Sequence, residues 1–304
     1  DPNDNLARPA ASGAPFGPIV IDFKNGTGRT NDGTNTFTKS ATVAIPTGIT
    51  GSGMAIIEGR PQVSIDGVLT SLQVTSVGLP FAITDAAAVD RRMVVDINKC
   101  NDCHNTLSLH GSNRTGNTEL CSTCHNPNAT DIARRVAGSA CVTTTGPDDQ
   151  TLDFKRMIHM IHASGHDGSG REGDPFLICG FGGAYTFEVG YPGRLRNCEG
   201  CHLPNTYYPV DPARVLATTM DASADRSTLT DDAAISPNTS VCSSCHTSSI
   251  ATEHMRQNGG DFAAGKNDSG TLISTGSETC ALCHGPGRIG DVKTVHGIGS
   301  FQSN

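Results

Sequence analysis

The pattern Cys-x-x-Cys-His occurs five times in this chain and constrains its fold more than any other feature. The chemistry of a c-type haem requires this spacing, because two thiols add across the two vinyl groups of one macrocycle and the adjacent His binds the iron. Zinc sites and disulfides also use paired cysteines, but neither requires a His directly after the second Cys. Every Cys-x-x-Cys of the sequence is followed by His. The pattern therefore predicts five covalently attached haems.

The motif assigns two roles by position. The cysteines predicted to form thioether bonds are Cys100, Cys103, Cys121, Cys124, Cys198, Cys201, Cys242, Cys245, Cys280 and Cys283. The histidines predicted to bind iron on the proximal side are His104, His125, His202, His246 and His284. Little chain separates the motifs, so we expect the haems to lie close together.

Six histidines remain as candidates for the distal side of the irons: His110, His159, His162, His166, His254 and His296. Five irons need five distal ligands, so two His ligands per iron are possible with one His to spare. His159 and His162 lie three residues apart in a predicted helix at 154–162, so they can reach two different haems. His166 follows Gly165 in a Gly-rich stretch and is the expected spare. An iron with two protein ligands has no open position, so this count favours electron transfer over catalysis.

Cys141 and Cys179 are the two cysteines outside the motifs. Unpaired thiols are a liability in an oxidising compartment, and a disulfide between these two would close the long segment between the second and third motifs. Two buried free thiols are the alternative. We expect the disulfide.

The chain divides into two regions of different character. Residues 1–95 contain no Cys and no His. Their alternating runs at 42–45, 62–65 and 72–77, bounded by Gly and Pro, predict short antiparallel strands in a small β-barrel or sandwich. Residues 96–304 hold all the cysteines and histidines and are rich in Gly, Ser, Asn and Asp. We expect a loop-rich pentahaem domain with short helices there.

Composition and charge narrow the function. The net charge of −8 argues against nucleic acid as a partner. Only 36% of residues are hydrophobic and Trp is absent, which is little for a core of side chains alone. Haem macrocycles would fill such an interior. No apolar run reaches the roughly 18–20 residues of a membrane-spanning helix. The polar start at Asp1 shows no leader or lipid-anchor Cys, so we expect the mature form or a part of an exported protein.

Acidic loops are a weaker signal. Asp167–Asp174 carries carboxylates that could bind Ca²⁺, and Asp231 with Asp232 is a lesser candidate. Neither matches an EF-hand, and a solvated loop is the simpler interpretation.

Longer stretches around the motifs resemble the outer-membrane multihaem cytochromes of metal-reducing bacteria, the OmcA/MtrC family. The resemblance spans about residues 92–298 and is carried by residues 100–111, 121–127, 157–162, 254–260 and 280–287, with His296. It implies a split β-barrel followed by a pentahaem domain. It also implies an extracellular or outer-surface location and electron transfer to minerals, flavin-type shuttles or other multihaem cytochromes. By position it supports His110, His159, His162, His254 and His296 as distal ligands.

Three functions stay open from the sequence. The first is an extracellular electron-transfer conduit. The second is the repeating subunit of a cytochrome filament, in which the chain binds copies of itself. The third is a multihaem enzyme acting on a small oxyanion or nitrogen compound, which requires an iron with an open position. Only one β-region and one pentahaem region are present, whereas family members commonly carry two such pairs. The β-region also lacks the cysteine pair often found in the family.

Overall fold

A computed structural model describes residues 18–24, 26–34, 36–41, 44–45, 47–135, 141, 149–165, 175–210, 215–221, 228–267, 272–273 and 276–299. Its helices are α1 (Ile97–His104), α2 (Thr118–Cys124), α3 (Phe154–Ala163), α4 (Pro237–Cys242), α5 (Ser249–Gln257), α6 (Ala281–His284) and α7 (Val292–Val295), with 3-10 turns η1 (Ile132–Arg134) and η2 (Cys198–Gly200). Its strands are β1 (Arg29–Asn31), β2 (Phe37–Lys39), β3 (Ser52–Ile57), β4 (Gln62–Ile65), β5 (Val68–Ser71), β6 (Val77–Ala82), β7 (Ser108–Leu109), β8 (Arg114–Thr115), β9 (Phe176–Gly180), β10 (Gly183–Phe187), β11 (Thr218–Asp221), β12 (Ala233–Ile235), β13 (Gly265–Lys266) and β14 (Leu272–Ile273).

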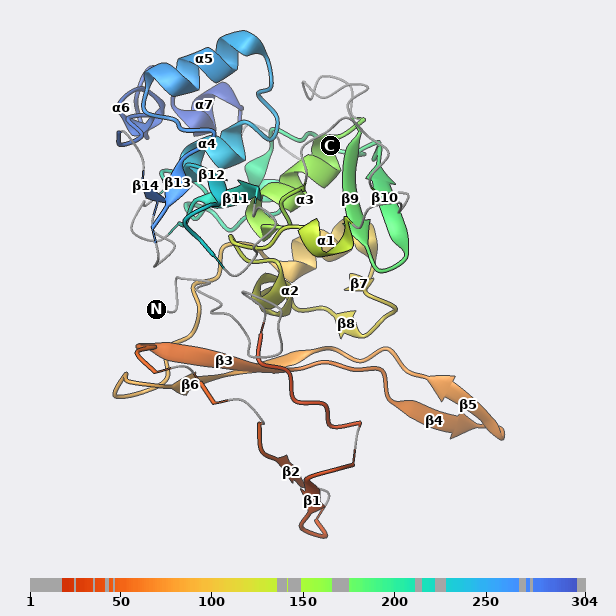
Figure 1. The fold of residues 1–304 in the computed structure, drawn as a ribbon. Helices are drawn as coiled ribbons and strands as arrows, with labels where there is room; N and C mark the ends of the chain where they lie inside the picture. Colours follow the sequence, from red (N-terminus) through yellow and green to blue (C-terminus); the bar gives the residue numbers. More distant parts are fainter. Residues whose placement is uncertain are drawn as a thin grey trace.

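Strands β3 to β6 form one long hairpin that extends away from the helices (Figure 1). The pair β3–β6 is antiparallel, and the pair β4–β5 continues it outward to a tight turn. Asp66 and Gly67 occupy this turn, with φ values of 50° and 80°. Asp-Gly tolerates positive φ at both positions, which a two-residue turn between twisted strands requires. The local sequence thus explains where the hairpin reverses.

Antiparallel strands are present, but of the alternating runs only 62–65 is a strand, β4, while residues 44–45 and 72–76 lie outside the strands. A closed barrel or sandwich is not among the residues described. Every sheet there has two strands. Apolar side chains of the hairpin such as Ile65, Val68 and Leu69 are exposed. Alternation places apolar residues along a strand, but a barrel also needs further strands to pair with its edges. The fold is mostly β with few short helices.

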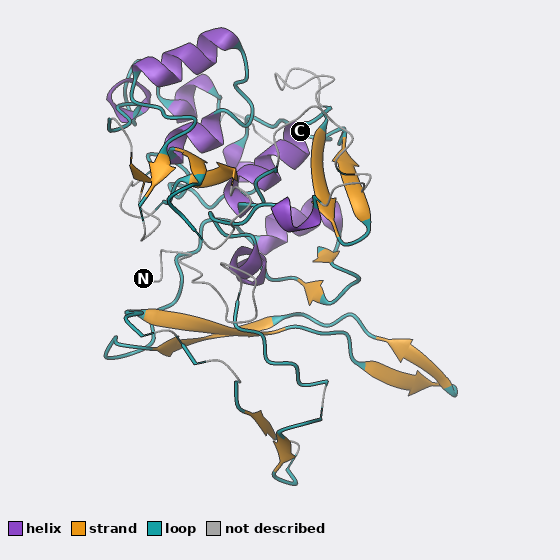
Figure 2. Ribbon diagram, viewed as in Figure 1, coloured by secondary structure: helices purple, strands orange, loops and turns teal. Residues whose placement is uncertain are grey.

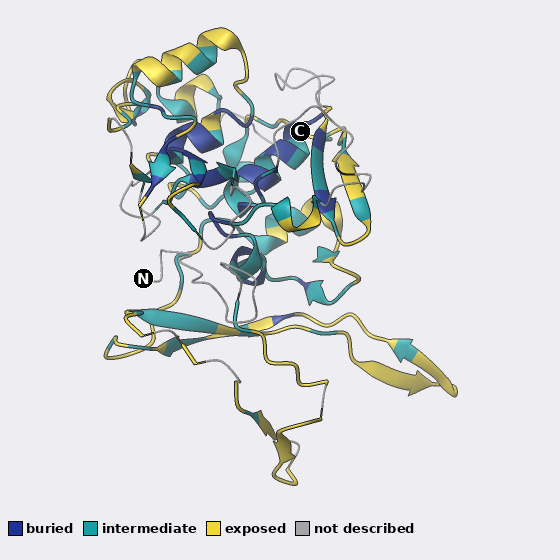
Figure 3. Ribbon diagram, viewed as in Figure 1, coloured by how far each residue is buried: buried dark blue, intermediate teal, exposed yellow. Residues whose placement is uncertain are grey.

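The helices gather in a second region, above the hairpin in Figure 2. Helix α3 lies inside it and buries Arg156, Met157, Met160 and Ala163. Met157 and Met160 pack with Phe176 of β9 as a small apolar core. Most of the buried residues lie in this region (Figure 3). They are more often polar than apolar. A side-chain core this small leaves much of the interior to be filled by something else.

The long hairpin is fastened to the helical region at its middle. The Glu58 carboxylate accepts a hydrogen bond of 3.0 Å from Arg114 Nη2. The backbone N–H of Ser76 donates to the Thr115 carbonyl at 2.9 Å, and Asn117 Nδ2 donates to the Ser76 carbonyl at 3.1 Å. Asn117 also caps α2 through its side chain. The hairpin therefore contacts the helix that carries the second motif.

Among the helices described, none is long and apolar enough to cross a membrane.

Candidate haem sites

Each motif is wound as a helical turn that brings its three reactive side chains together. In the later motifs the His backbone N–H donates to the carbonyl of the first Cys, at 2.9 Å in His125, His202 and His246 and 2.8 Å in His284. The first motif lies within α1. Residues i, i+3 and i+4 of a helix share one face. Both thiols and the imidazole of a motif therefore face the same side.

Every motif His lies opposite a second His from elsewhere in the chain. We number the sites 1 to 5 by motif. The ring centroids are 6.1 Å apart for His104 and His162 (site 1), 6.0 Å for His125 and His110 (site 2), 6.0 Å for His202 and His159 (site 3), 6.1 Å for His246 and His296 (site 4), and 6.0 Å for His284 and His254 (site 5). The five partners are the five expected distal residues, one at each site. His166 lies outside the residues described.

A centroid separation of about 6 Å suits one metal ion between two imidazoles. A metal–imidazole nitrogen bond is about 2 Å long. Two such bonds and the two ring radii account for the separation. The near-constant value across sites of different sequence argues for a shared ligand geometry.

Backbone hydrogen bonds set the tautomer of several of these rings. The Nδ1 atoms donate to carbonyl oxygens: His125 to Leu152 at 3.1 Å, His162 to Ile158 at 2.9 Å, His284 to Gly290 at 2.9 Å, His296 to Val292 at 2.9 Å, and His159 to Lys155. A ring that donates from Nδ1 keeps the lone pair on Nε2 for a metal. These five rings are therefore oriented as metal ligands.

Burial keeps several of the rings neutral, which is the form that binds metal. It is the main cause that lowers the pKa of His110, His125, His159 and His246. At site 3 burial, followed by the charges of His159 and Lys99, lowers the pKa of His202 to about 4.

The ten motif cysteines are not paired with one another. Burial raises the pKa of Cys100 and of Cys198 to about 11, and that of Cys242 to about 12, with Cys280 as the next cause at Cys242. Thiols held protonated and unpaired beside an imidazole remain available for thioether bonds. Ten thiols in five pairs, each pair next to a ring pair, fit five c-type haems.

Apolar side chains beside the ring pairs are exposed. Ile250, one turn before His254 on α5, is 82% exposed, and Leu282 within the fifth motif is 69% exposed. Val295, next to His296, is also exposed. Apolar surface of this kind is stabilised when an apolar macrocycle covers it. These residues therefore fit the group that the thiols and imidazoles imply, and a bound haem would supply reversible one-electron chemistry at its iron.

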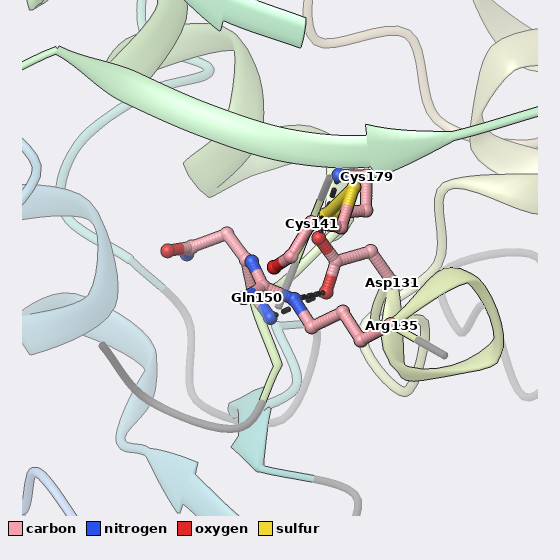
Figure 4. The surroundings of a disulfide bond; sticks show 5 residues. All are labelled: Asp131, Arg135, Cys141, Gln150 and Cys179. Carbon is pink, nitrogen blue, oxygen red and sulfur yellow. Dashed lines mark hydrogen bonds and ion pairs between the residues drawn. A yellow bond between two sulfur atoms is a disulfide. The ribbon is translucent and has the colours of Figure 1, made fainter. Parts of the chain in front are cut away.

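Cys141 and Cys179 form a disulfide with their Cα atoms 5.9 Å apart (Figure 4). A buried carboxylate organises the surrounding chain. Asp131 Oδ2 accepts from the Cys179 N–H at 2.8 Å, while Oδ1 accepts from Arg135 Nε and from the Gln150 N–H, both at 2.7 Å. The disulfide and Asp131 together join β9 to the chain between the second motif and α3.

The acidic candidates for Ca²⁺ stay predictions. Residues 167–174 lie outside the part of the chain that the structure describes. The Asp232 carboxylate pairs with Lys266, with Nζ 3.1 Å from Oδ2. In the described ranges no three His, Cys, Asp or Glu side chains gather as a metal site.

Contacts between motifs show which sites are neighbours. Helix α3 carries both His162 of site 1 and His159 of site 3. Lys99 Nζ, in α1, donates to the Glu199 and His202 carbonyls at 2.6 and 2.9 Å. Sites 1 and 3 are thus adjacent. His110 of site 2 lies in the segment directly after α1, which carries the first motif, so site 2 adjoins site 1.

Sites 3, 4 and 5 are connected by charged side chains that sequence analysis did not single out. Glu199, inside the third motif, pairs with Lys293 of α7 at 3.3 Å, and α7 leads into His296 of site 4. Glu278, just before the fifth motif, accepts from the N–H groups of Asn238 and Thr239 at 2.8 and 2.7 Å, at the start of α4. Site 3 therefore adjoins site 4, and site 4 adjoins site 5. No pattern marks a charged residue that joins two motifs distant in sequence.

Paired imidazoles behind Cys-x-x-Cys-His turns are the ligand arrangement of a multihaem c-type cytochrome. The chain belongs to the outer membrane cytochrome family described as MtrC/MtrF-like, domains II/IV, whose model matches residues 92–297.

One solved structure agrees with this at the level of the fold. The outer membrane decahaem cytochrome OmcA matches 97% of this chain with a TM-score of 0.54 and 19% identity. MtrC from Shewanella baltica OS185 matches 93% with a TM-score of 0.46 and 17% identity. The chain spans only 42% and 43% of those two proteins. No curated protein sequence matches it.

Proposed function

We propose that this chain binds five c-type haems, each with two His ligands, and passes electrons from one to the next. The five ring pairs at 6.0–6.1 Å carry the proposal, because each joins a motif His to a different distal His. The cysteines of each motif would hold the haem through thioether bonds. The five distal ligands are those of the ring pairs.

The contacts between motifs support an order of sites 2–1–3–4–5 for the electron path. Sites 1 and 3 share α3, sites 3 and 4 are joined through Glu199 and Lys293, and sites 4 and 5 through Glu278. Consecutive sites in this order share a helix, an adjoining segment or a polar contact. A row in which each iron has two protein ligands transfers electrons without binding substrate.

We further propose that the protein works outside the cell or at its outer surface. Membership in an outer-membrane cytochrome family supports this location. Minerals, flavin-type shuttles and other multihaem cytochromes are the proposed exchange partners. Residues 1–95 and 96–304 are proposed as the β-domain and the pentahaem domain.

The first test is to produce the chain in a bacterial host that attaches c-type haem and to measure its intact mass and haem content. We expect five haems per chain and low-spin spectra that carbon monoxide leaves unchanged in the reduced state. Fewer than five haems per chain would contradict the proposed haem number. Carbon monoxide binding would indicate an open iron position and revive a catalytic role.

The ring angles sharpen this test. The two rings are nearly parallel at sites 2 and 3, at 29° and 7°, and steep at sites 1, 4 and 5, at 82°, 69° and 84°. The angle between axial rings changes the splitting of the iron d orbitals, so electron paramagnetic resonance separates the two classes. We expect two sites in the near-parallel class and three in the near-perpendicular class. A single class would contradict the ligand pairs.

A further inference from the structure

The third motif differs from the other four in its backbone. Each of the others overlaps an α-helix, namely α1, α2, α4 or α6, whereas Cys198–Gly200 forms only the 3-10 turn η2. Gly200 inside the motif and Pro204 just after it both disfavour an α-helix, which accounts for the difference. A 3-10 turn has poorer hydrogen-bond geometry than a helix. Contacts from outside the motif are therefore needed to orient the side chains of site 3.

Tyr207 contacts the third motif at two points. Its ring approaches the His202 ring edge-on, with the centroids 5.8 Å apart and the planes at 65°. Its hydroxyl donates to Glu199 Oε1 at 3.0 Å, and Glu199 directly follows the first Cys of the motif. The neighbouring Thr206 fixes this segment, because its hydroxyl donates to the Val94 carbonyl at 2.8 Å. One side chain therefore joins the proximal imidazole of site 3 to the chain between the two cysteines.

Both contacts restrict the orientation of the groups that they touch. An edge-to-face contact between aromatic rings favours one relative orientation of the two rings. The Glu199 carboxylate also lies 3.3 Å from Lys293 Nζ, through the same Oε1 atom that accepts from Tyr207. A hydroxyl bonded to an ionised carboxylate is held more firmly than one bonded to a neutral group. Because the hydroxyl is fixed in this way, the tyrosine ring keeps its place against His202.

The ring planes of His202 and His159 are only 7° apart, against 29° in the other near-parallel pair, at site 2. His159 is fixed by its bond to the Lys155 carbonyl on α3. We propose that Tyr207 is a positioning residue of site 3, which holds the His202 ring nearly parallel to that of His159. The angle between the two rings affects the electronic state of an iron bound between them, so Tyr207 acts on site 3 without touching the metal. This inference rests on the proposed five-haem function.

A role in packing alone predicts a different outcome. Tyr207 would then stabilise the fold by filling space, and its removal would lower the urea midpoint without changing the ring angle at site 3. Three substitutions separate the two roles. Tyr207→Leu removes both contacts, Tyr207→Phe keeps the ring and loses the hydroxyl, and Glu199→Gln keeps an acceptor but loses the charge.

The experiment is electron paramagnetic resonance of the oxidised, haem-loaded protein. In Tyr207→Leu we expect one of the two near-parallel components, that of site 3, to move or broaden while the component of site 2 stays at the parent position. Tyr207→Phe and Glu199→Gln should cause the same change to a smaller extent, because the ring still lies against His202. An unchanged spectrum in Tyr207→Leu, with five haems attached, would overturn the proposal and leave Tyr207 a packing role.

Haem content is measured first on each protein. Fewer than five haems in the parent chain would show that the five-haem proposal fails, whereas the role of Tyr207 is judged from the variants. If Tyr207→Leu attaches only four haems, the missing component should belong to the near-parallel class. Loss of a near-perpendicular component instead would contradict a role at site 3.

Tyr185→Leu is the matched control. Tyr185 lies on β10, opposite Ile178 of β9, and is 48% exposed. The same substitution there should leave both near-parallel components at the parent position. Equal changes in Tyr185→Leu and Tyr207→Leu would point to a general loosening of the fold and contradict a local effect.

Discussion

The long hairpin is held together mainly by backbone hydrogen bonds, whereas the helical region is held together mainly by side-chain contacts. In the hairpin, backbone pairing between β3 and β6 supplies the structure, and Ser76 is the sole buried residue among those described from 18 to 95. In the helical region the elements are short, and side chains such as Asp131 and Glu278 join segments that lie far apart in sequence. Backbone pairing therefore orders the hairpin although the hairpin has almost no buried core. The helical region is organised around ten imidazoles and ten thiols.

The largest effect should come from withholding haem. Chain produced without haem attachment should lose most of its helical signal and its protection from hydrogen exchange in residues 96–299, because so little apolar side-chain core remains. Circular dichroism and hydrogen exchange measure this. Full protection in the haem-free chain would show that side chains alone supply the core, and the contrast between the two regions would disappear.

Removing the disulfide should have the next largest effect. Cys141→Ser with Cys179→Ser should lower the free energy of unfolding by about 2–4 kcal/mol, because the closed segment gains freedom in the unfolded chain. The shift of the urea midpoint of the haem-loaded protein measures it. Haem content should stay at the parent value. A loss of haem in this variant would mean that the disulfide is needed for attachment itself.

Neutralising Glu278 should cost about 1–2 kcal/mol at neutral pH, because charge-assisted hydrogen bonds at the start of α4 are weakened. Burial alone would raise the pKa of this carboxyl, but hydrogen bonds from Thr239, Asn238 and Ser236 outweigh burial and hold it below 4.5. A carboxyl with a lowered pKa in the folded state adds stability above its unfolded pKa, and that stability is lost as the pH falls through the folded pKa.

The measurement is the urea midpoint of parent and Glu278→Gln at neutral pH and at pH values below about 4.5. The difference between the two proteins should shrink at the acid end. A difference that stays constant with pH would mean that the Glu278 charge does not contribute.

The smallest effect should come from the hairpin tip. Replacing residues 61–72, which include β4 and β5, by a short turn should leave haem content and spectra unchanged, since β4 and β5 lie away from the helices in Figure 1. The same variant tests a filament, because exposed strand edges are sites for pairing with another chain. Electron microscopy of parent and variant decides this: filaments of the parent that vanish in the variant would assign assembly to the tip.

Local chemistry was readable from the sequence, and tertiary pairing was not. Each motif marks the thiols and the His predicted for one haem, because a single helical turn holds all three groups. Counting and resemblance singled out the five His that lie opposite the motif His, but no pattern reveals that His104 lies opposite His162 while His202 lies opposite His159. Those pairs depend on how α3 crosses the molecule.

Two other features were also beyond the sequence. The alternating run at 62–65 is strand β4, but residues 72–76 of another run lie outside the strands. Alternation also does not state how many strands pair, so the barrel did not follow. Tyr207 looks like any loop tyrosine until its ring is placed against the third motif.

Helix α3 also has a mechanical role. His159 and His162 are three residues apart on one rigid helix. Their Cα atoms are therefore separated by about 4.5 Å along the helix axis, a distance set by the helical rise. Neighbouring sites that share a helix move together when the surrounding loops fluctuate. Electron tunnelling falls off steeply with distance, so in the proposed electron path the step between sites 1 and 3 should be the least sensitive to thermal motion. Because two of the proposed distal ligands lie on α3, one kink in this helix would displace both at once.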